Sequence, residues 1–155
     1  MLASLLALLG CDAKKIAELE EGVATEADVR AKFGEPVAVY PEEGGGKTFD
    51  YPRQPEGQRN YMITIGADGK MSALRQVLTP LNFAKVTPGL DKAQVRRLLG
   101  VPAKTQVYAL KNEEVWDWRY LDSQESKLFS VTFDKDGVVL ATGSMLDPRA
   151  ASPGG

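Results

Sequence analysis

The pattern of apolar and polar residues predicts helices and antiparallel strands in a repeating order. Val29 and Phe33 are four residues apart, which places both side chains on one face of a helix. Val95 and Leu99 repeat this spacing later in the chain. Strand-like segments follow each helix, and residues 60–65 alternate apolar and polar side chains as a half-buried strand does. The pattern therefore predicts a helix followed by a sheet, twice.

Both predicted helices end with a glycine that is followed two residues later by a proline. Gly34 precedes Pro36, and Gly100 precedes Pro102. Glycine accepts the left-handed backbone that closes a helix, and proline prevents the helix from continuing. The two stretches also share an alanine, a valine and an arginine at equivalent positions. We therefore interpret the chain as two copies of one module.

The predicted helix starts recur as well. Thr25 and Asp91 each precede a helix, and Asp28 and Gln94 follow them three residues later, which is the pattern of a capping box. The corresponding Asp-Gly hairpin turns are at residues 68–69 and 136–137.

The sequence thus predicts an α+β fold with two tandem modules, each a helical layer packed on an antiparallel sheet of about four strands. Apolar side chains on the inward faces should form the core. These are Val29, Phe33, Ile63, Ile65, Val95, Leu99, Val131 and Phe133.

An apolar run opens the chain and leads to its only cysteine, Cys11. Residues 1–10 are too few to span a bilayer, which takes about 20 residues, but they suit the apolar part of a secretory signal. No Lys or Arg precedes this run, so we expect the signal peptide to be incomplete. The alternative is a buried N-terminal helix in which the cysteine is incidental.

Residues 8–11, Leu-Leu-Gly-Cys, resemble a bacterial lipobox, in which the cysteine is lipidated and becomes the first residue of the mature chain. The resemblance implies a lipid-anchored protein with acyl chains, such as palmitate, on Cys11. Asp12 follows the cysteine, and in enteric bacteria aspartate there resembles a signal for retention in the inner membrane. The inner membrane therefore stays open beside the outer membrane.

These patterns divide the chain into six predicted parts. They are a signal peptide (1–10), a lipidated N-terminal segment (11–21), a first module (22–78), a linker (79–88), a second module (89–147) and a disordered tail (148–155).

Composition argues against catalysis and against nucleic acid as a partner. The chain has no histidine, one cysteine and a net charge of −2. This excludes histidine-based triads, Cys/His zinc sites and internal disulfides, and it leaves no basic stripe for nucleic acid. Residues 44–48 are Gly-rich but lack the spacing of a phosphate-binding loop, and residues 134–137 are too short for a calcium loop. We expect no enzyme activity, cofactor, metal or small-molecule substrate.

One predicted strand carries Trp116, Trp118 and Tyr120 on a single face. Burial beneath the module's helix is one interpretation, and the aromatic residues at positions 49 and 51 of the first module favour it. The alternative is a binding surface, where Trp, Tyr and Arg carry much of the energy. The candidate protein-binding residues are Arg59, Trp116, Trp118 and Arg119.

The lipobox, the helix with its Gly-x-Pro end and the strands with an Asp-Gly hairpin together resemble the small outer-membrane assembly lipoproteins called SmpA, OmlA or BamE. The resembling modules span residues 22–78 and 89–146. The resemblance implies a non-catalytic, periplasm-facing accessory subunit that binds other envelope proteins, among them subunits of the machinery that inserts β-barrels into the outer membrane. Two copies depart from the usual single module. The tandem also resembles β-lactamase inhibitor proteins, which implies an alternative function, inhibition of a periplasmic or secreted enzyme.

Overall fold

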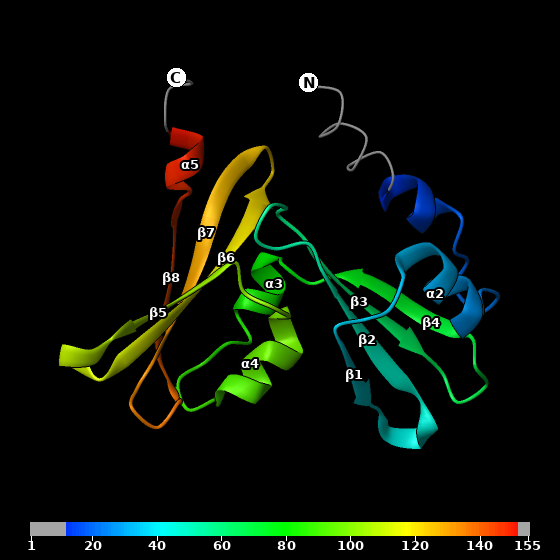
Figure 1. The fold of residues 1–155 in the computed structure, drawn as a ribbon, viewed down its shortest axis with the longest axis horizontal. Helices are drawn as coiled ribbons and strands as arrows, with labels where there is room; N and C mark the ends of the chain where they lie inside the picture. The colour runs from blue at the N-terminus through cyan, green and yellow to red at the C-terminus, as the bar shows by residue number, and fades with distance from the viewer. Residues whose placement is uncertain (1–11, 152–155) are drawn as a thin grey trace. The chain divides into compact units, whose positions relative to one another are not determined.

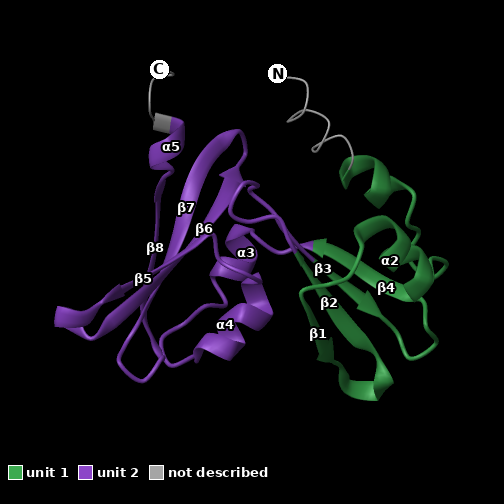
Figure 2. Ribbon diagram, in the orientation of Figure 1, with its two compact units in different colours: residues 1–51, 62–75 green, residues 52–61, 76–155 purple. Residues whose placement is uncertain are grey.

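The computed structural model describes residues 12–151; the predicted signal peptide, Cys11 and residues 152–155 lie outside this range. The fold consists of two four-stranded sheets with helices between the strands (Figure 1). The chain divides into two compact units (Figure 2). Unit 1 is Met1–Tyr51 with Met62–Arg75, and unit 2 is Pro52–Tyr61 with Gln76–Gly155. The predicted α+β class with two tandem modules is confirmed.

The first sheet has the strand order β1-β2-β3-β4 and follows helix α2 (Glu26–Phe33). Residues 12–17 are also helical. The strands are β1 (Ala38–Pro41), β2 (Lys47–Pro52), β3 (Asn60–Ile65) and β4 (Met71–Gln76), with the short 3-10 helix η1 (Glu43–Gly45) between β1 and β2.

The second sheet repeats this plan with the order β5-β6-β7-β8, and its neighbouring strands are antiparallel. Two helices precede it, α3 (Pro80–Phe83) and α4 (Lys92–Leu99). The strands are β5 (Lys104–Tyr108), β6 (Glu113–Asp122), β7 (Glu125–Phe133) and β8 (Val139–Leu146), with η2 (Ala109–Lys111) between β5 and β6 and α5 (Pro148–Ala151) after β8.

Both predicted capping boxes are present. The Thr25 hydroxyl accepts from the Asp28 N–H at 3.2 Å, and the Asp28 carboxylate accepts from the Thr25 N–H at 2.9 Å. Asp91 and Gln94 form the same reciprocal pair at 2.8 and 2.9 Å. Each box provides acceptors for two backbone N–H groups, one at the cap residue and one in the first turn, that a helix start would otherwise leave unpaired.

The glycines that end α2 and α4 have positive φ, at 79° for Gly34 and 76° for Gly100. Their ψ of −160° is extended rather than left-handed helical, a region that only glycine enters readily. An aromatic side chain from the sheet then binds each glycine's carbonyl. The Tyr51 hydroxyl donates to Gly34 O at 2.9 Å, and Trp118 Nε1 donates to Gly100 O at 3.2 Å. The duplication therefore extends to individual hydrogen bonds.

All eight residues of the predicted core are buried. Within unit 1, the Phe33 and Tyr51 rings lie 5.3 Å apart between α2 and the sheet. Within unit 2, the Trp116 ring lies 4.7 Å from that of Phe133 beneath α4. Burial of such side chains contributes on the order of 1.5–3 kcal/mol each.

The two modules share a helix-to-sheet ion pair in which the charges are exchanged. Glu26 begins α2 and pairs with Lys47 of β2 at 2.7 Å. Lys92 begins α4 and pairs with Glu114 of β6. If either helix packed on the other module's sheet, two like charges would meet at this place. The exchanged charges therefore favour packing of each helix on the sheet of its own module. Such repulsion in the wrong pairing prevents misassembly of duplicated modules.

We predict that Lys92→Glu destabilises unit 2 by about 0.5–1 kcal/mol, because two carboxylates would then face each other at a partly exposed site. Lys92→Glu combined with Glu114→Lys should recover most of this loss. Denaturant unfolding followed by circular dichroism measures both variants. Lys111→Glu, the same change at an exposed residue of η2, is the matched control and should have little effect. A double variant no more stable than Lys92→Glu alone would contradict the prediction.

The predicted linker, residues 79–88, is instead part of unit 2. Thr79 caps α3, and Pro80 occupies its first turn, where the missing N–H has no cost. The Phe83 ring stacks on that of Phe129 with centroids 4.0 Å apart. Pro80 thus starts a short helix that supplies an aromatic side chain to the core.

The predicted disordered tail is also wrong in part, because residues 148–151 form α5. The Asp147 carboxylate accepts from the Arg149 N–H at 3.0 Å and so fixes the start of this helical turn. The rest of the predicted tail lies outside the described residues.

Residues 52–61 depart from the predicted module boundaries, since they belong to unit 2. Gln54 binds the backbone of Arg119 twice: its Nε2 donates to Arg119 O, and its Oε1 accepts from Arg119 N, both at 2.9 Å. Gln58 Nε2 donates to the Ser126 hydroxyl at 2.7 Å. Polar side chains of this segment are thus hydrogen-bonded to strands of unit 2.

Candidate protein-binding surface

The structure places two of the four candidate binding residues in the core of unit 2. Trp116 is 8% exposed and Trp118 is 0% exposed. Both face the side of β6 that lies beneath α4, where Trp118 Nε1 binds Gly100 O. The interpretation as core is therefore the correct one, and the burial excludes direct contact of these side chains with a partner.

Arg119 is held by an ion pair within unit 2. Its side chain is 17% exposed, and its guanidinium lies 2.5 Å from the buried Asp147 carboxylate. Burial raises the pKa of Asp147, but the hydrogen bonds from Arg119 and from the Arg149 N–H, together with the charges of both arginines, bring this pKa below its usual value. Arg119 thus compensates a buried carboxylate. No sequence signal identified Asp147, because it belongs to neither repeated motif.

Arg59 is the one candidate of the four whose side chain is exposed. It lies in the segment 52–61 of unit 2, where its carbonyl accepts from the Arg53 N–H at 3.1 Å. Arg59 therefore remains a candidate for contact with a partner.

Exposed apolar side chains of unit 2 gather on its edge strands, which the sequence analysis did not identify. Strand β5 is exposed along its whole length, and β8 is exposed after its first residue. The exposed large apolar residues of unit 2 are Leu81, Val107, Tyr108, Leu110, Leu140, Met145 and Leu146. Alternation alone does not distinguish an edge strand from a central one, although the absence of charge in residues 139–146 is a usable signal.

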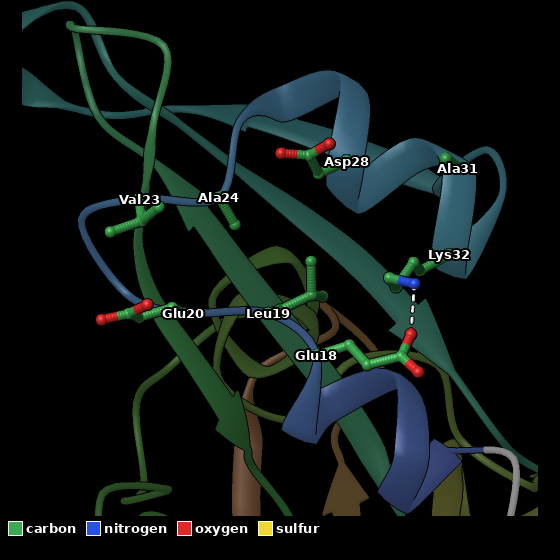
Figure 3. Close-up of a pocket in the computed structure, with 8 residues that line it drawn as sticks. All are labelled: Glu18, Leu19, Glu20, Val23, Ala24, Asp28, Ala31 and Lys32. Atoms are coloured by element: carbon green, nitrogen blue, oxygen red, sulfur yellow. Dashed lines mark hydrogen bonds and ion pairs between the residues drawn. The ribbon is translucent and has the colours of Figure 1, made fainter.

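A hollow in unit 1 lies between α2 and the segment that precedes it (Figure 3). Lys32 points toward Glu18 and forms an ion pair with it, and their hydrogen bond is the main cause of a lowered pKa for Glu18. The backbone N–H of Thr25 lowers the pKa of Asp28 in the same way. Both carboxylates are therefore ionised at neutral pH and already hydrogen-bonded within unit 1, so neither is suited to act as a general acid.

Across residues 12–151, no group of three or more His, Cys, Asp and Glu side chains is arranged to hold a metal ion. None of the helices in this range is long and apolar enough to cross a membrane.

Comparison with known proteins gives one family model that matches part of the chain. Residues 76–143, less than half of the chain, match the family model described as the outer membrane protein assembly factor BamE domain. No curated protein matches the sequence significantly.

Three solved structures are similar. The osmotically inducible lipoprotein OsmE is 24% identical, with 45% of this chain and 75% of that chain covered and a TM-score of 0.40. The DUF4309 family protein YjgB from Bacillus subtilis is 20% identical, with 84% and 83% covered and a TM-score of 0.33. A Streptococcus mutans protein described as a β-lactamase inhibitor protein is 10% identical, with 79% and 82% covered and a TM-score of 0.34.

The matched family residues begin at Gln76, the last residue of β4, where unit 2 resumes, and they continue through α3, α4 and β5 to β7 into β8. Unit 1 repeats the order of helix, strands and hairpin turn. Residues 76–143 are therefore similar to a BamE domain, and unit 1 has the same helix-and-sheet plan.

Proposed function

We propose that this protein is a non-catalytic, lipid-anchored envelope protein that binds other proteins, as an accessory subunit in the assembly of outer-membrane β-barrels. The match of residues 76–143 to a domain of an outer-membrane assembly factor carries the proposal. In this proposal the protein faces the periplasm from the outer membrane, and its partners are subunits of the assembly machinery.

The chemistry of the described side chains supports binding rather than catalysis. The chain has no histidine, and the carboxylates with lowered pKa serve in caps and ion pairs. The apolar residues exposed on β5 offer a surface for a protein partner, since exposed apolar patches mark such sites.

The proposed anchor is a set of acyl chains on Cys11. Two anchoring signals are enough for stable attachment, so a lipoprotein with several acyl chains needs no membrane-spanning helix.

We predict that the full chain, expressed with radiolabelled fatty acid, incorporates label and that Cys11→Ala abolishes it. Ser4→Ala lies outside the lipobox and should keep the label. Equal labelling of the Cys11→Ala variant, or none in any variant, would contradict lipidation. Separating inner from outer membranes afterwards shows which membrane holds the protein and what Asp12 does.

The binding function is tested by recovery of partners. A tagged full chain should copurify with barrel-assembly subunits from detergent-solubilised membranes of its own host, and mass spectrometry identifies them. Arg59→Glu should reduce this recovery if Arg59 contacts the partner, whereas Lys135→Glu, on an exposed turn, serves as the matched control. If no assembly subunit is recovered and the purified soluble domain inhibits a periplasmic hydrolase at a one-to-one ratio, the protein is an inhibitor instead.

A further inference from the structure

Strand β8 is an edge strand of the second sheet, and it lacks the features that usually prevent an edge from pairing with another strand. Its sequence, Val-Leu-Ala-Thr-Gly-Ser-Met-Leu, has no charged residue and no proline, and residues 140–146 are all exposed. The other edges carry such features: β1 has four residues and ends in Pro41, β4 carries the exposed Arg75, and β5 begins with the exposed Lys104. Natural proteins use short strands, charges and prolines to prevent pairing between edges. Among the four edge strands of residues 12–151, β8 is therefore the one that lacks these features and is open to another strand.

The backbone of β8 has a defined set of outward donors and acceptors. The Asp147 N–H donates to Ser126 O at 3.0 Å, so this pair is a hydrogen-bonded one. Hydrogen-bonded and non-hydrogen-bonded pairs alternate along an antiparallel ladder. The N–H and C=O groups of Thr142, Ser144 and Leu146 therefore point away from β7, toward the open edge.

We propose that this edge binds a second copy of the chain through antiparallel pairing of the two β8 strands, with Ser144 on the two-fold axis. In this register Ser144 pairs with Ser144 of the second copy, and Thr142 pairs with Leu146 of the second copy, in both directions. The outward groups of the three residues then form about six hydrogen bonds. The inference rests on the strand geometry and is independent of the proposed function.

The side chains that meet in this register are complementary in size and carry no charge. Met145, which is 55% exposed, lies opposite Gly143 of the second copy. A Cβ built on Gly143 meets nothing within 4 Å, so there is open space for the thioether. No charged side chain of either β8 meets another, and the pairing therefore carries no like-charge repulsion. One strand pair is smaller than the interface of a stable dimer, so association should be weak and depend on concentration.

Disulfide trapping tests the pairing and its register in the full chain. With Cys11→Ala in place, Ser144→Cys should form a disulfide-linked dimer under mild oxidation. Paired residues at such a position have Cα atoms about 5.5 Å apart, within the range that a disulfide spans. Thr142→Cys is the matched control, because it is exposed on the same face but its equivalent lies about four residues, or roughly 13 Å, along the partner strand. Equal trapping of both cysteines, or of neither, would overturn the register.

Sedimentation velocity over a range of concentrations tests the affinity. Ser144→Lys places two ammonium groups opposite each other and should raise the dimer dissociation constant by about tenfold or more. Gln106→Lys makes the same change on the β5 edge and should leave the constant unchanged. Ser144 also accepts a hydrogen bond from Tyr120, so Thr142→Lys serves as a second disrupting variant free of that contact. A chain that stays monomeric at millimolar concentration, or two lysine variants on β8 without effect, would contradict the proposal, and neither result bears on the pull-down of assembly subunits.

Discussion

Replacing Trp118 with alanine is expected to destabilise unit 2 by about 3–5 kcal/mol, the range for removal of a large aromatic side chain from a core. Trp118 is fully buried, its ring lies 6.0 Å from that of Trp116 and 6.4 Å from that of Phe129, and its Nε1 binds Gly100 O. The substitution therefore leaves a cavity and also removes the hydrogen bond at the end of α4. Denaturant unfolding followed by circular dichroism measures the loss without relying on the fluorescence of the residue removed.

Two control variants separate the parts of this effect. Trp118→Phe keeps much of the ring and removes the Nε1 donor, so its cost should be clearly smaller than that of Trp118→Ala. Leu110→Ala truncates a fully exposed apolar residue between β5 and β6 and should change stability by less than about 0.5 kcal/mol. A loss below about 1 kcal/mol for Trp118→Ala would show that the strand's aromatic face is not the core of unit 2.

The sequence predicted those parts of the fold that depend on neighbouring residues. A capping box, a glycine with positive φ and a strand are each encoded within a few positions, as Thr25, Gly34 and residues 60–65 illustrate. The predicted half-buried alternation of residues 60–65 was wrong, however, because side chains on both faces of this strand are buried. The duplication strengthened the assignments, because the pattern of one module checked that of the other. The aromatic residues at the matching positions of β2 favoured burial of those on β6 over a binding surface, and both sets are buried.

The parts that the sequence did not predict depend on contacts between distant residues. Pro80 marks the start of α3 as readily as a linker, and only the stacking of Phe83 on Phe129 decides between them. Likewise, the polar residues of 52–61 are typical of a solvated loop until Gln54 is seen bound to Arg119. Polar composition does not distinguish hydrogen bonds to water from hydrogen bonds to a strand.

The candidate binding residues were predicted less well than the fold. Of the four, the tryptophans are core and Arg119 serves the buried Asp147, which leaves Arg59 exposed. Residue types enriched in interfaces are also those that fill cores and pair with buried charges, so type alone did not separate these roles. The exposed edge of β8 was missed because exposure of an edge is a property of the assembled sheet.

The second large effect on stability is expected from substitution of Asn60, a buried polar residue. It is 0% exposed and its side chain is fully hydrogen-bonded within unit 2. Its Nδ2 donates to Leu99 O at 2.8 Å and to Val101 O at 2.9 Å, and its Oδ1 accepts from the Arg53 N–H at 3.0 Å. The side chain thus satisfies backbone groups at the end of α4 and in the segment 52–61 together.

We predict that Asn60→Ala destabilises unit 2 by about 2–4 kcal/mol, since each buried group left without its partner costs about 1–3 kcal/mol. Gln58→Ala removes one hydrogen bond from the same segment at a partly exposed site and should cost less than about 1 kcal/mol. Equal losses for the two variants in denaturant unfolding would contradict the role given to Asn60.

Asn60→Asp distinguishes lost hydrogen bonds from a simple change in packing, because it keeps the shape of the side chain. The carboxylate oxygen that replaces Nδ2 would face the carbonyls of Leu99 and Val101, where no donor reaches it, and this burial raises the pKa of the carboxyl group above its value in the unfolded chain. A protonated carboxyl donates one hydrogen bond there and an ionised one donates none. A raised folded-state pKa means that the stabilising contribution is present at low pH and is lost as pH rises through that pKa. The deficit of Asn60→Asp relative to the natural chain should therefore shrink from pH 7 toward pH 4.5, whereas that of Asn60→Ala should stay constant, and parallel pH profiles for the two variants would contradict the hydrogen-bonding argument.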